Sequence, residues 1–145
     1  MILISHRGNL TGPNPDRENH PDYIQQARSK DYQVEIDVWY ENNKWFLGHD
    51  KPQYEVEQTF FYDPFLWAHA KNIPALKQLS FLGIHCFWHQ TDDVALTTLG
   101  YLWTYPGKPL TTKSICVMPE TIPQTREDVK IAAGICSDII ERISL

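Results

Sequence analysis

The segment Gln33-Val34-Glu35-Ile36-Asp37-Val38 alternates polar and apolar side chains. Successive side chains of a β-strand point to opposite faces, so a strand here places Glu35 and Asp37 on one face and the apolar residues on the other. In an antiparallel sandwich the acidic face would simply be solvated. In a parallel barrel the two carboxylates would lie near the end of the strand, at the site where such folds carry their chemistry.

Short apolar or β-branched runs of similar length recur along the chain, separated by polar connectors rich in Pro and Gly. Together with residues 33–38 they predict eight strands. The other candidates are Ile2–Ser5, Trp45–Gly48, Leu66–Ala70, Leu82–Trp88, Tyr101–Thr104, Ser114–Met118 and Gly134–Ile140.

Helical patterns fall between these strands. The candidates are Pro21 to about Lys30, Ile73–Leu79, Asp92–Leu99 and Thr121–Ala133. Alternation of strand and helix is typical of parallel sheets, and eight strands close a (β/α)8 barrel of the TIM type.

The length of the chain limits this fold. TIM-type barrels usually need about 200 residues or more, whereas this chain has 145. Prolines in the connections 49–65 and 105–113 also argue against regular helices there. We therefore predict one domain, residues 1–145, folded as a pared-down barrel with several crossover helices shortened or missing. An open doubly wound sheet is the alternative.

Composition restricts the partners and the compartment. The formal net charge is −5 and no long basic run is present, which argues against nucleic acid as an obligate partner. No stretch approaches the roughly 18 apolar residues of a membrane span, and the N-terminal residues lack the pattern of a signal peptide. We therefore expect a cytoplasmic protein. A bound cation could still attract a phosphate to this acidic chain.

Candidate catalytic residues directly follow predicted strands. His6 and Arg7 come after the first strand, and His49 comes after the strand that ends at Gly48. The carboxyl ends of barrel strands form the active-site face. Histidine suits general acid–base catalysis, and arginine can contact two phosphate oxygens at once. Each histidine by itself is also compatible with a structural or surface role.

Four short motifs occur in an order that resembles the glycerophosphodiester phosphodiesterases, a family of the phospholipase C-like phosphodiesterase superfamily. The motifs are His6-Arg7-Gly8, Glu18-Asn19, Glu35-Ile36-Asp37 and Gly48-His49-Asp50. The resemblance implies metal-dependent hydrolysis of a glycerophosphodiester-like or related small-molecule phosphodiester. It also implies His6 and His49 as the acid–base pair, Arg7 as a phosphate contact, and Glu35 and Asp37 as ligands of Mg²⁺ or Ca²⁺, with Mn²⁺ as a further candidate.

The resemblance is weaker after residue 50. The family carries a further acidic ligand two residues before a lysine, and the comparable segment here is Ala68-His69-Ala70-Lys71. Lys71 fits the pattern as a phosphate contact, but His69 stands where a glutamate is expected. Either the imidazole completes the metal site, or water does, or the metal is held more weakly. An imidazole ligand would favour transition ions over Mg²⁺ and Ca²⁺, and a hydrogen-bonded interior role for His69 is the other alternative.

Two later residues are further candidates for substrate contacts. His89 ends a predicted strand, and Trp103 lies in a segment similar to a late strand of the same family. Core packing is an equal alternative for Trp103, and for His89 a core or supporting role is the favoured interpretation. At the level of function, two alternatives stay open: an inactive barrel that binds a phosphate-containing ligand or protein partner, and a metal-dependent hydrolase acting at a carbon centre. The sequence does not specify an oligomeric state.

Overall fold

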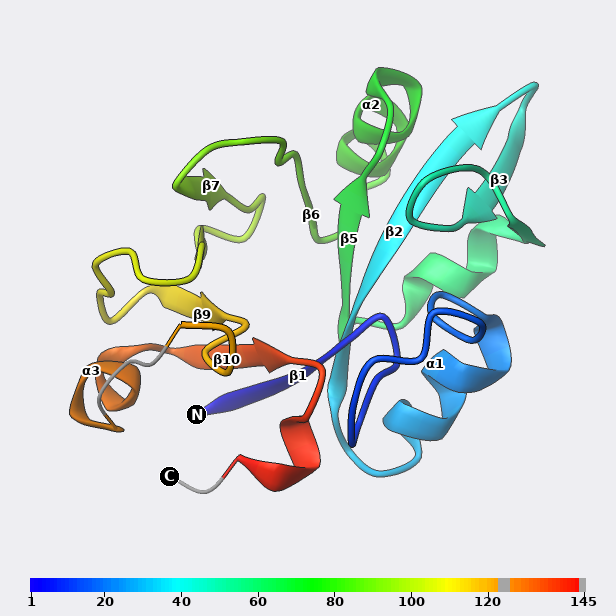
Figure 1. Cartoon of the computed structure of the whole chain (residues 1–145). Helices are drawn as coiled ribbons and strands as arrows, with labels where there is room; N and C mark the ends of the chain where they lie inside the picture. Colours follow the sequence, from blue (N-terminus) through cyan, green and yellow to red (C-terminus); the bar gives the residue numbers. More distant parts are fainter. Residues whose placement is uncertain (123–125, 144–145) are drawn as a thin grey trace.

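A computed structural model describes residues 1–122 and 126–143 of the chain. The described residues form a curled, open sheet with helices packed against its outer face (Figure 1). The strands are β1 (Ile2–His6), β2 (Gln33–Glu41), β3 (Lys44–Leu47), β4 (Tyr54–Val56), β5 (Leu66–Ala70), β6 (Cys86–Phe87), β7 (Val94–Leu96), β8 (Leu102–Thr104), β9 (Ser114–Val117) and β10 (Gly134–Ser137). The α-helices are α1 (Pro21–Arg28), α2 (Ile73–Phe81) and α3 (Arg126–Ile131), and η1 (Gln58–Tyr62) and η2 (Ile140–Arg142) are short 3₁₀ helices.

Most neighbouring strands are parallel. The order β6-β5-β2-β1-β10-β9-β8 is parallel throughout. Antiparallel β3 and β4 extend the sheet beside the far end of β2, and antiparallel β7 pairs with β8. The register places His6 opposite Glu35 and Asp37 opposite His69, so three neighbouring strands bring their polar residues to the same level.

The predicted TIM-type (β/α)8 barrel is wrong. The described residues contain three α-helices, and the sheet mixes parallel and antiparallel strands. No pairing in the described chain joins β6 to β7 or β8, so the sheet stays open. Connections this short produce hairpins in place of crossover helices, because antiparallel strands need only a tight turn between them. The doubly wound alternative is also wrong, because all three helices pack on the same core cluster.

Local sequence signals explain the helices that do form. Helix α1 begins with Pro21 behind His20, whose side chain accepts a hydrogen bond from the Asp22 N–H. Asn72 caps α2 in the same way through the Ala75 N–H. The helix predicted over Asp92–Leu99 is wrong, since this segment contains β7 and pairs with β8. Among the described residues, no helix has the length and apolar character needed to cross a membrane.

Side-chain alternation along the strands produces two cores. The outer cluster includes Val34, Ile36 and Val38 of β2 and packs against the helices. The inner cluster lines the concave face and consists of Ile4, Trp67, Phe87, Ala95, Trp103, Ile115, Val117 and Cys136. In a strand, the residue two positions after an inner apolar residue points to the same face. In five strands that residue is polar. These residues are His6, His69, His89, Tyr105 and Asp138, and they lie at the carboxyl ends of the parallel strands.

Candidate active site

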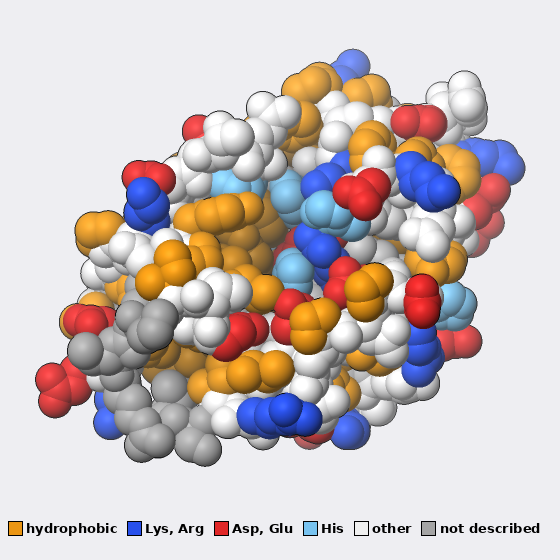
Figure 2. All heavy atoms as spheres, viewed as in Figure 1, with side chains coloured by type: hydrophobic (Ala, Val, Ile, Leu, Met, Phe, Trp, Pro, Cys, Tyr) orange, Lys and Arg blue, Asp and Glu red, His pale blue; other side chains and the backbone are white. Residues whose placement is uncertain are grey.

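A cavity of about 420 Å³ opens above the inner apolar cluster. Figure 2 shows histidine, cationic and acidic side chains gathered around a hollow near the centre of the molecule. The lining residues are His6, Arg7, Glu35, His49, His69, Ala70, Lys71, Trp88, His89, Gln90, Trp103, Tyr105, Pro106, Val117, Met118 and Thr121. Eight of the nine residues predicted from the sequence therefore meet at this cavity, and the ninth, Asp37, lies fully buried beside it.

Asp37 is held by a network of cations and an amide. Arg7 Nε lies 2.9 Å from Asp37 Oδ2, and Lys71 Nζ lies 3.6 Å from Oδ1. Asn19 donates to Oδ2 through Nδ2 at 2.9 Å, and its Oδ1 accepts from the Asp37 N–H at the same distance. Burial alone would raise the pKa of Asp37, but contact with His69 and the charges of Arg7 and Lys71 hold it well below its ordinary value. Asp37 is therefore a carboxylate at neutral pH.

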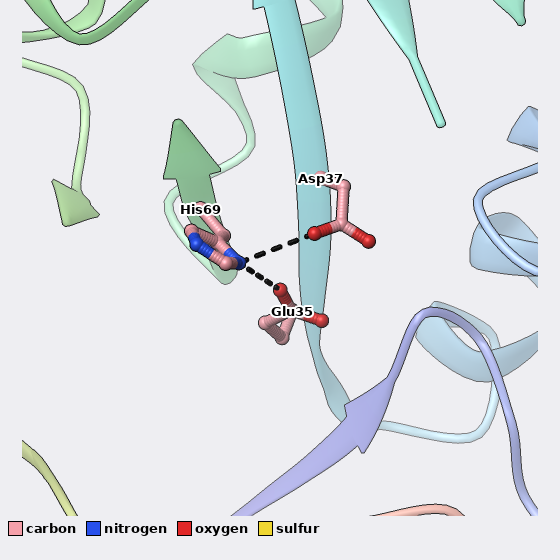
Figure 3. Close-up of side chains that lie close together, drawn as sticks. All are labelled: Glu35, Asp37 and His69. Atoms are coloured by element: carbon pink, nitrogen blue, oxygen red, sulfur yellow. Dashed lines mark ion pairs between the residues drawn. The ribbon is translucent and has the colours of Figure 1, made fainter. Parts of the chain in front are cut away.

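Glu35 and Asp37 do not form a solvated strand face, because their side chains are 2% and 0% exposed. Both point toward His69 on the neighbouring strand β5 (Figure 3). His69 Nδ1 lies 3.2 Å from Asp37 Oδ1 and 3.7 Å from Glu35 Oε1. Burial lowers the pKa of His69, but its contacts with the two carboxylates raise it to about 9.

The other ring nitrogen of His69 fixes its tautomer. Nε2 lies 3.0 Å from the carbonyl oxygen of His89. A carbonyl oxygen only accepts hydrogen bonds, so Nε2 carries the proton, and the lone pair of the neutral imidazole is on Nδ1. This arrangement is the one found at metal-binding histidines, in which the second nitrogen donates to a backbone carbonyl or a carboxylate.

The donor set fits a divalent cation. Ligand atoms of Glu35, Asp37 and His69 all lie within 4.8 Å of one another. Glu35 Oε2 and Asp37 Oδ1 are buried and accept no hydrogen bond within the described chain. Nitrogens of His6, His69 and Lys71 lie 3.2–3.8 Å from these oxygens, but a buried carboxylate oxygen that accepts no hydrogen bond is costly. Neighbouring ligands of one octahedral ion at about 2.1 Å lie roughly 3 Å apart, which is close to the 3.2 Å between His69 Nδ1 and Asp37 Oδ1.

His6 is positioned by a carboxylate. Its Nδ1 lies 2.8 Å from Asp138 Oδ1, which also accepts a hydrogen bond from Asn9 Nδ2 at 2.7 Å. The carboxylate keeps the proton on Nδ1, and Nε2 lies 3.8 Å from Glu35 Oε2. Burial lowers the pKa of His6, but the hydrogen bond with Asp138 and the charge of Glu35 outweigh burial, and the pKa is raised.

His49 is placed by a tight turn after β3. Gly48 has φ of 147°, and a Cβ at this position would overlap the carbonyl oxygen of Lys51. Trp39 Nε1 donates to the Gly48 carbonyl oxygen at 2.7 Å and holds the turn against β2. The His49 side chain is 43% exposed, and its Nδ1 lies 2.7 Å from Asp50 Oδ1. It therefore stands at the rim of the cavity, while His6 lies inside.

The two later candidates, His89 and Trp103, also line the cavity. The rings of His89 and Tyr105 lie 4.0 Å apart, and neither ring nitrogen of His89 has a hydrogen-bond partner in the described chain. Burial and the charge of His69 lower the pKa of His89. Trp103 stacks on Phe87 at 4.6 Å and is 4% exposed, so it both lines the cavity and belongs to the inner core.

Sequence reasoning missed Asp138 as a positioning residue and assigned no role to Asn19. Asp138 follows the last strand directly, at the same end of the sheet as His6. That placement after a strand is the signal that could have identified it. Asn19 lies in a loop with φ of 63° and reaches Asp37 across a sequence gap, so no local pattern reveals its contact.

Comparison with known proteins adds no family to these observations. No family model, curated protein or solved structure matches this chain. The resemblance to glycerophosphodiester phosphodiesterases thus rests on the motifs alone, and the site itself has to support any functional conclusion.

Proposed function

We propose that this protein is a metal-dependent phosphodiesterase that uses His6 and His49 as a general acid–base pair. The main support is the convergence of His6, His49, Arg7, Lys71 and the Glu35–Asp37–His69 cluster on one cavity. These groups come from separate strands and loops. Together they supply proton transfer, phosphate binding and a cation site, which are the requirements of displacement at phosphorus.

The cation would be held by Glu35, Asp37 and His69. When bound, a divalent ion polarises a phosphate oxygen and offsets the charge that develops during displacement. Mg²⁺, Ca²⁺ and Mn²⁺ all accept carboxylate ligands, and the nitrogen of His69 adds a ligand suited to a transition ion. Asn19 and the His89 carbonyl oxygen orient Asp37 and His69, respectively.

The two histidines divide the proton transfers. One accepts the proton of the attacking water or substrate hydroxyl, and the other donates a proton to the leaving oxygen. Asp138 holds His6 with Nε2 toward the cavity and raises its pKa. A raised pKa favours the protonated imidazole, which suits His6 to the part of general acid, with His49 as the base.

Arg7 and Lys71 complete the charge balance. Both line the cavity, and both form ion pairs with the buried Asp37. Their positive charges, next to the phosphate, would offset the negative charge that accumulates on its oxygens. Arg7 has a φ of 55°, which is uncommon for a non-glycine residue and is often found at functional sites.

A second candidate function is binding of a phosphate-containing ligand or protein partner without turnover. One observation favours it: with its pKa raised to about 9, His69 is protonated at neutral pH. Together with Arg7 and Lys71 it balances the two carboxylates even without a metal ion. The same groups would then form a cationic phosphate site.

Turnover separates the two candidates. A panel of glycerophosphodiesters and bis(p-nitrophenyl) phosphate is assayed with Mg²⁺, Ca²⁺ or Mn²⁺. Alanine at His6 or His49 should lower the rate on glycerophosphodiesters by roughly 10²–10⁴-fold, the usual contribution of a positioned proton donor or acceptor. The p-nitrophenolate leaving group needs little protonation, so the His6 variant should retain more activity on bis(p-nitrophenyl) phosphate than the His49 variant.

His20→Asn is the matched control. This histidine caps α1 away from the cavity, and asparagine preserves the capping acceptor. The control should turn over substrate like the wild type. Wild-type rates in both single variants, or no hydrolysis of any diester with any ion, would refute the enzymatic proposal and leave the binding function.

A further inference from the structure

The cavity has two chemically different walls. One wall carries the acid–base, cationic and carboxylate groups described above. The other is largely aromatic and apolar and is formed by Trp88, Trp103, Tyr105, Pro106, Val117 and Met118. Phosphate chemistry requires only the first wall, so the second is free to select part of the substrate.

The aromatic wall leaves ring surface uncovered. Tyr105 is 38% exposed although its ring packs against His89 at 4.0 Å. Two residues earlier in the chain, Trp103 stacks on Phe87 at 4.6 Å with an angle of 29° between their planes. A planar group of the substrate can stack on such an exposed aromatic ring.

A second cavity of about 400 Å³ adjoins the first and shares Arg7 and His49 with it. Apart from Pro15, its remaining lining is polar and consists of Glu18, Asn19, Asp50, Lys51 and Gln53. Arg7 and His49 therefore stand between an aromatic compartment and a hydrophilic one. The two ester arms of a phosphodiester leave phosphorus in different directions, so a phosphate at this boundary directs one arm into each compartment.

We propose that the substrate is an asymmetric phosphodiester, with a planar aromatic arm against Tyr105 and a small hydrophilic arm in the second cavity. This inference rests on the proposed function, because it places the reacting phosphate at Arg7 and His49. It adds the substrate class, which the acid–base and metal residues leave unspecified.

The charges of the cavity favour a neutral arm. Aromatic rings also attract quaternary ammonium groups such as choline. Here, however, Arg7 and Lys71 line the same space, and Glu35 is the one carboxylate among the described residues that line it. A cationic arm would therefore meet like charges, which cost binding energy at close range. A neutral ring gains stacking without this cost.

Binding of phosphate monoesters tests whether the first cavity prefers an aromatic arm. This test does not require turnover. Benzyl, cyclohexylmethyl and methyl phosphate and phosphocholine are titrated against the full chain by calorimetry in the presence of Mn²⁺. Stacking predicts that benzyl phosphate binds roughly 5- to 100-fold more tightly than methyl phosphate, and more tightly than cyclohexylmethyl phosphate or phosphocholine. Equal affinity for benzyl and cyclohexylmethyl phosphate, or tightest binding of phosphocholine, would overturn the aromatic assignment.

Tyr105→Leu removes the ring and retains apolar bulk. The preference for benzyl over methyl phosphate should largely disappear in this variant, whereas Tyr62→Leu, at an exposed tyrosine of η1 outside both cavities, should keep it. An unchanged preference in Tyr105→Leu would contradict the inference. If diesters are hydrolysed but all monoesters bind equally, the arm assignment fails alone; if no diester is hydrolysed with any ion, the proposed function fails.

Discussion

His69 is the residue that most clearly distinguishes this site from a purely carboxylate cation site. Its Nδ1 lone pair faces Glu35 and Asp37 because Nε2 donates to the His89 carbonyl oxygen. Oxygen ligands suit Mg²⁺ and Ca²⁺, whereas imidazole nitrogen raises affinity for Mn²⁺ and later transition ions. The identity of one side chain should therefore determine which ion the protein selects.

We predict that His69→Glu reverses the selectivity of the site. The wild type should bind Mn²⁺ at least about tenfold more tightly than Mg²⁺ or Ca²⁺, and the variant should lose most of this preference. Calorimetric titration of each ion alone measures the effect, with His20→Asn as the control. Identical ion preferences in the wild type and His69→Glu would show that His69 is not a ligand.

Asp138 gives a prediction for the dependence of stability on pH. Burial would raise the pKa of this carboxyl, but the hydrogen bond and charge of His6 and the hydrogen bond from Asn9 lower it below its ordinary value of 3.8. A carboxyl with a depressed pKa stabilises the fold above that ordinary value, and the contribution is lost as the pH falls through the folded-state pKa.

Asp138→Asn should therefore lower the free energy of unfolding by about 1–2 kcal/mol at pH 7, since a charge-assisted hydrogen bond becomes a neutral one. The difference between variant and wild type should shrink as the pH is lowered below about 4. Urea unfolding at a series of pH values measures it. A difference that stays constant from pH 7 to pH 3 would mean that the carboxylate charge of Asp138 contributes nothing.

At the scale of the elements, a tight turn joins β2 to β3, where a (β/α)8 barrel would have a crossover helix. Asn42 and Asn43 have φ of 51° and 62°, and the register pairs Glu41 with Lys44 across them. Two central residues with positive φ form the type I′ turn that suits the twist of a two-residue hairpin. The hairpin directs the chain back along β2 and brings His49 to the rim of the cavity.

Substitutions at Asn43 test this turn. Alanine has no favourable left-handed conformation, so Asn43→Ala should lower the free energy of unfolding by about 1 kcal/mol, whereas Asn43→Gly should leave it unchanged or raise it slightly. Thermal or urea unfolding of the pair of variants provides the comparison. Equal stability of the two variants would show that the turn does not need positive φ at this residue.

The sequence predicted individual strands better than their partners. Leu66–Ala70 has the predicted bounds, and the alternation in residues 33–38 correctly placed Glu35 and Asp37 on one face. Of the strand predicted at Leu82–Trp88, only Cys86–Phe87 is a strand in the structure, and the segment 92–99 predicted as a helix contains β7. Short segments follow their pairing partners more than their own propensity, and β7 pairs with β8, which lies within the predicted strand Tyr101–Thr104.

At the scale of the whole molecule, the curled sheet brings the site residues together, as the predicted closed barrel would have done. Its parallel strands bring His6, Glu35, Asp37 and His69 together. His6 and His69 stand at or just before the carboxyl ends of β1 and β5, and the register places them opposite Glu35 and Asp37 of β2. Local alternation and strand-end placement made that convergence predictable. Closure would require strand pairing between β6 and the β7–β8 hairpin, and no sequence pattern indicates whether these two edges pair.

The central claim is that a divalent ion at Glu35, Asp37 and His69 supports hydrolysis of phosphodiesters in the cavity they share with His6 and His49. Metal-stripped protein is titrated with Mn²⁺ while hydrolysis of bis(p-nitrophenyl) phosphate is recorded. Activity should be absent in EDTA, appear as the ion is added, and saturate near equimolar ion. Glu35→Gln should abolish this response, and Glu41→Gln, an exposed carboxylate at the far end of β2, should leave it intact. Hydrolysis that persists in EDTA, or that responds to the ion equally in both variants, would contradict the account.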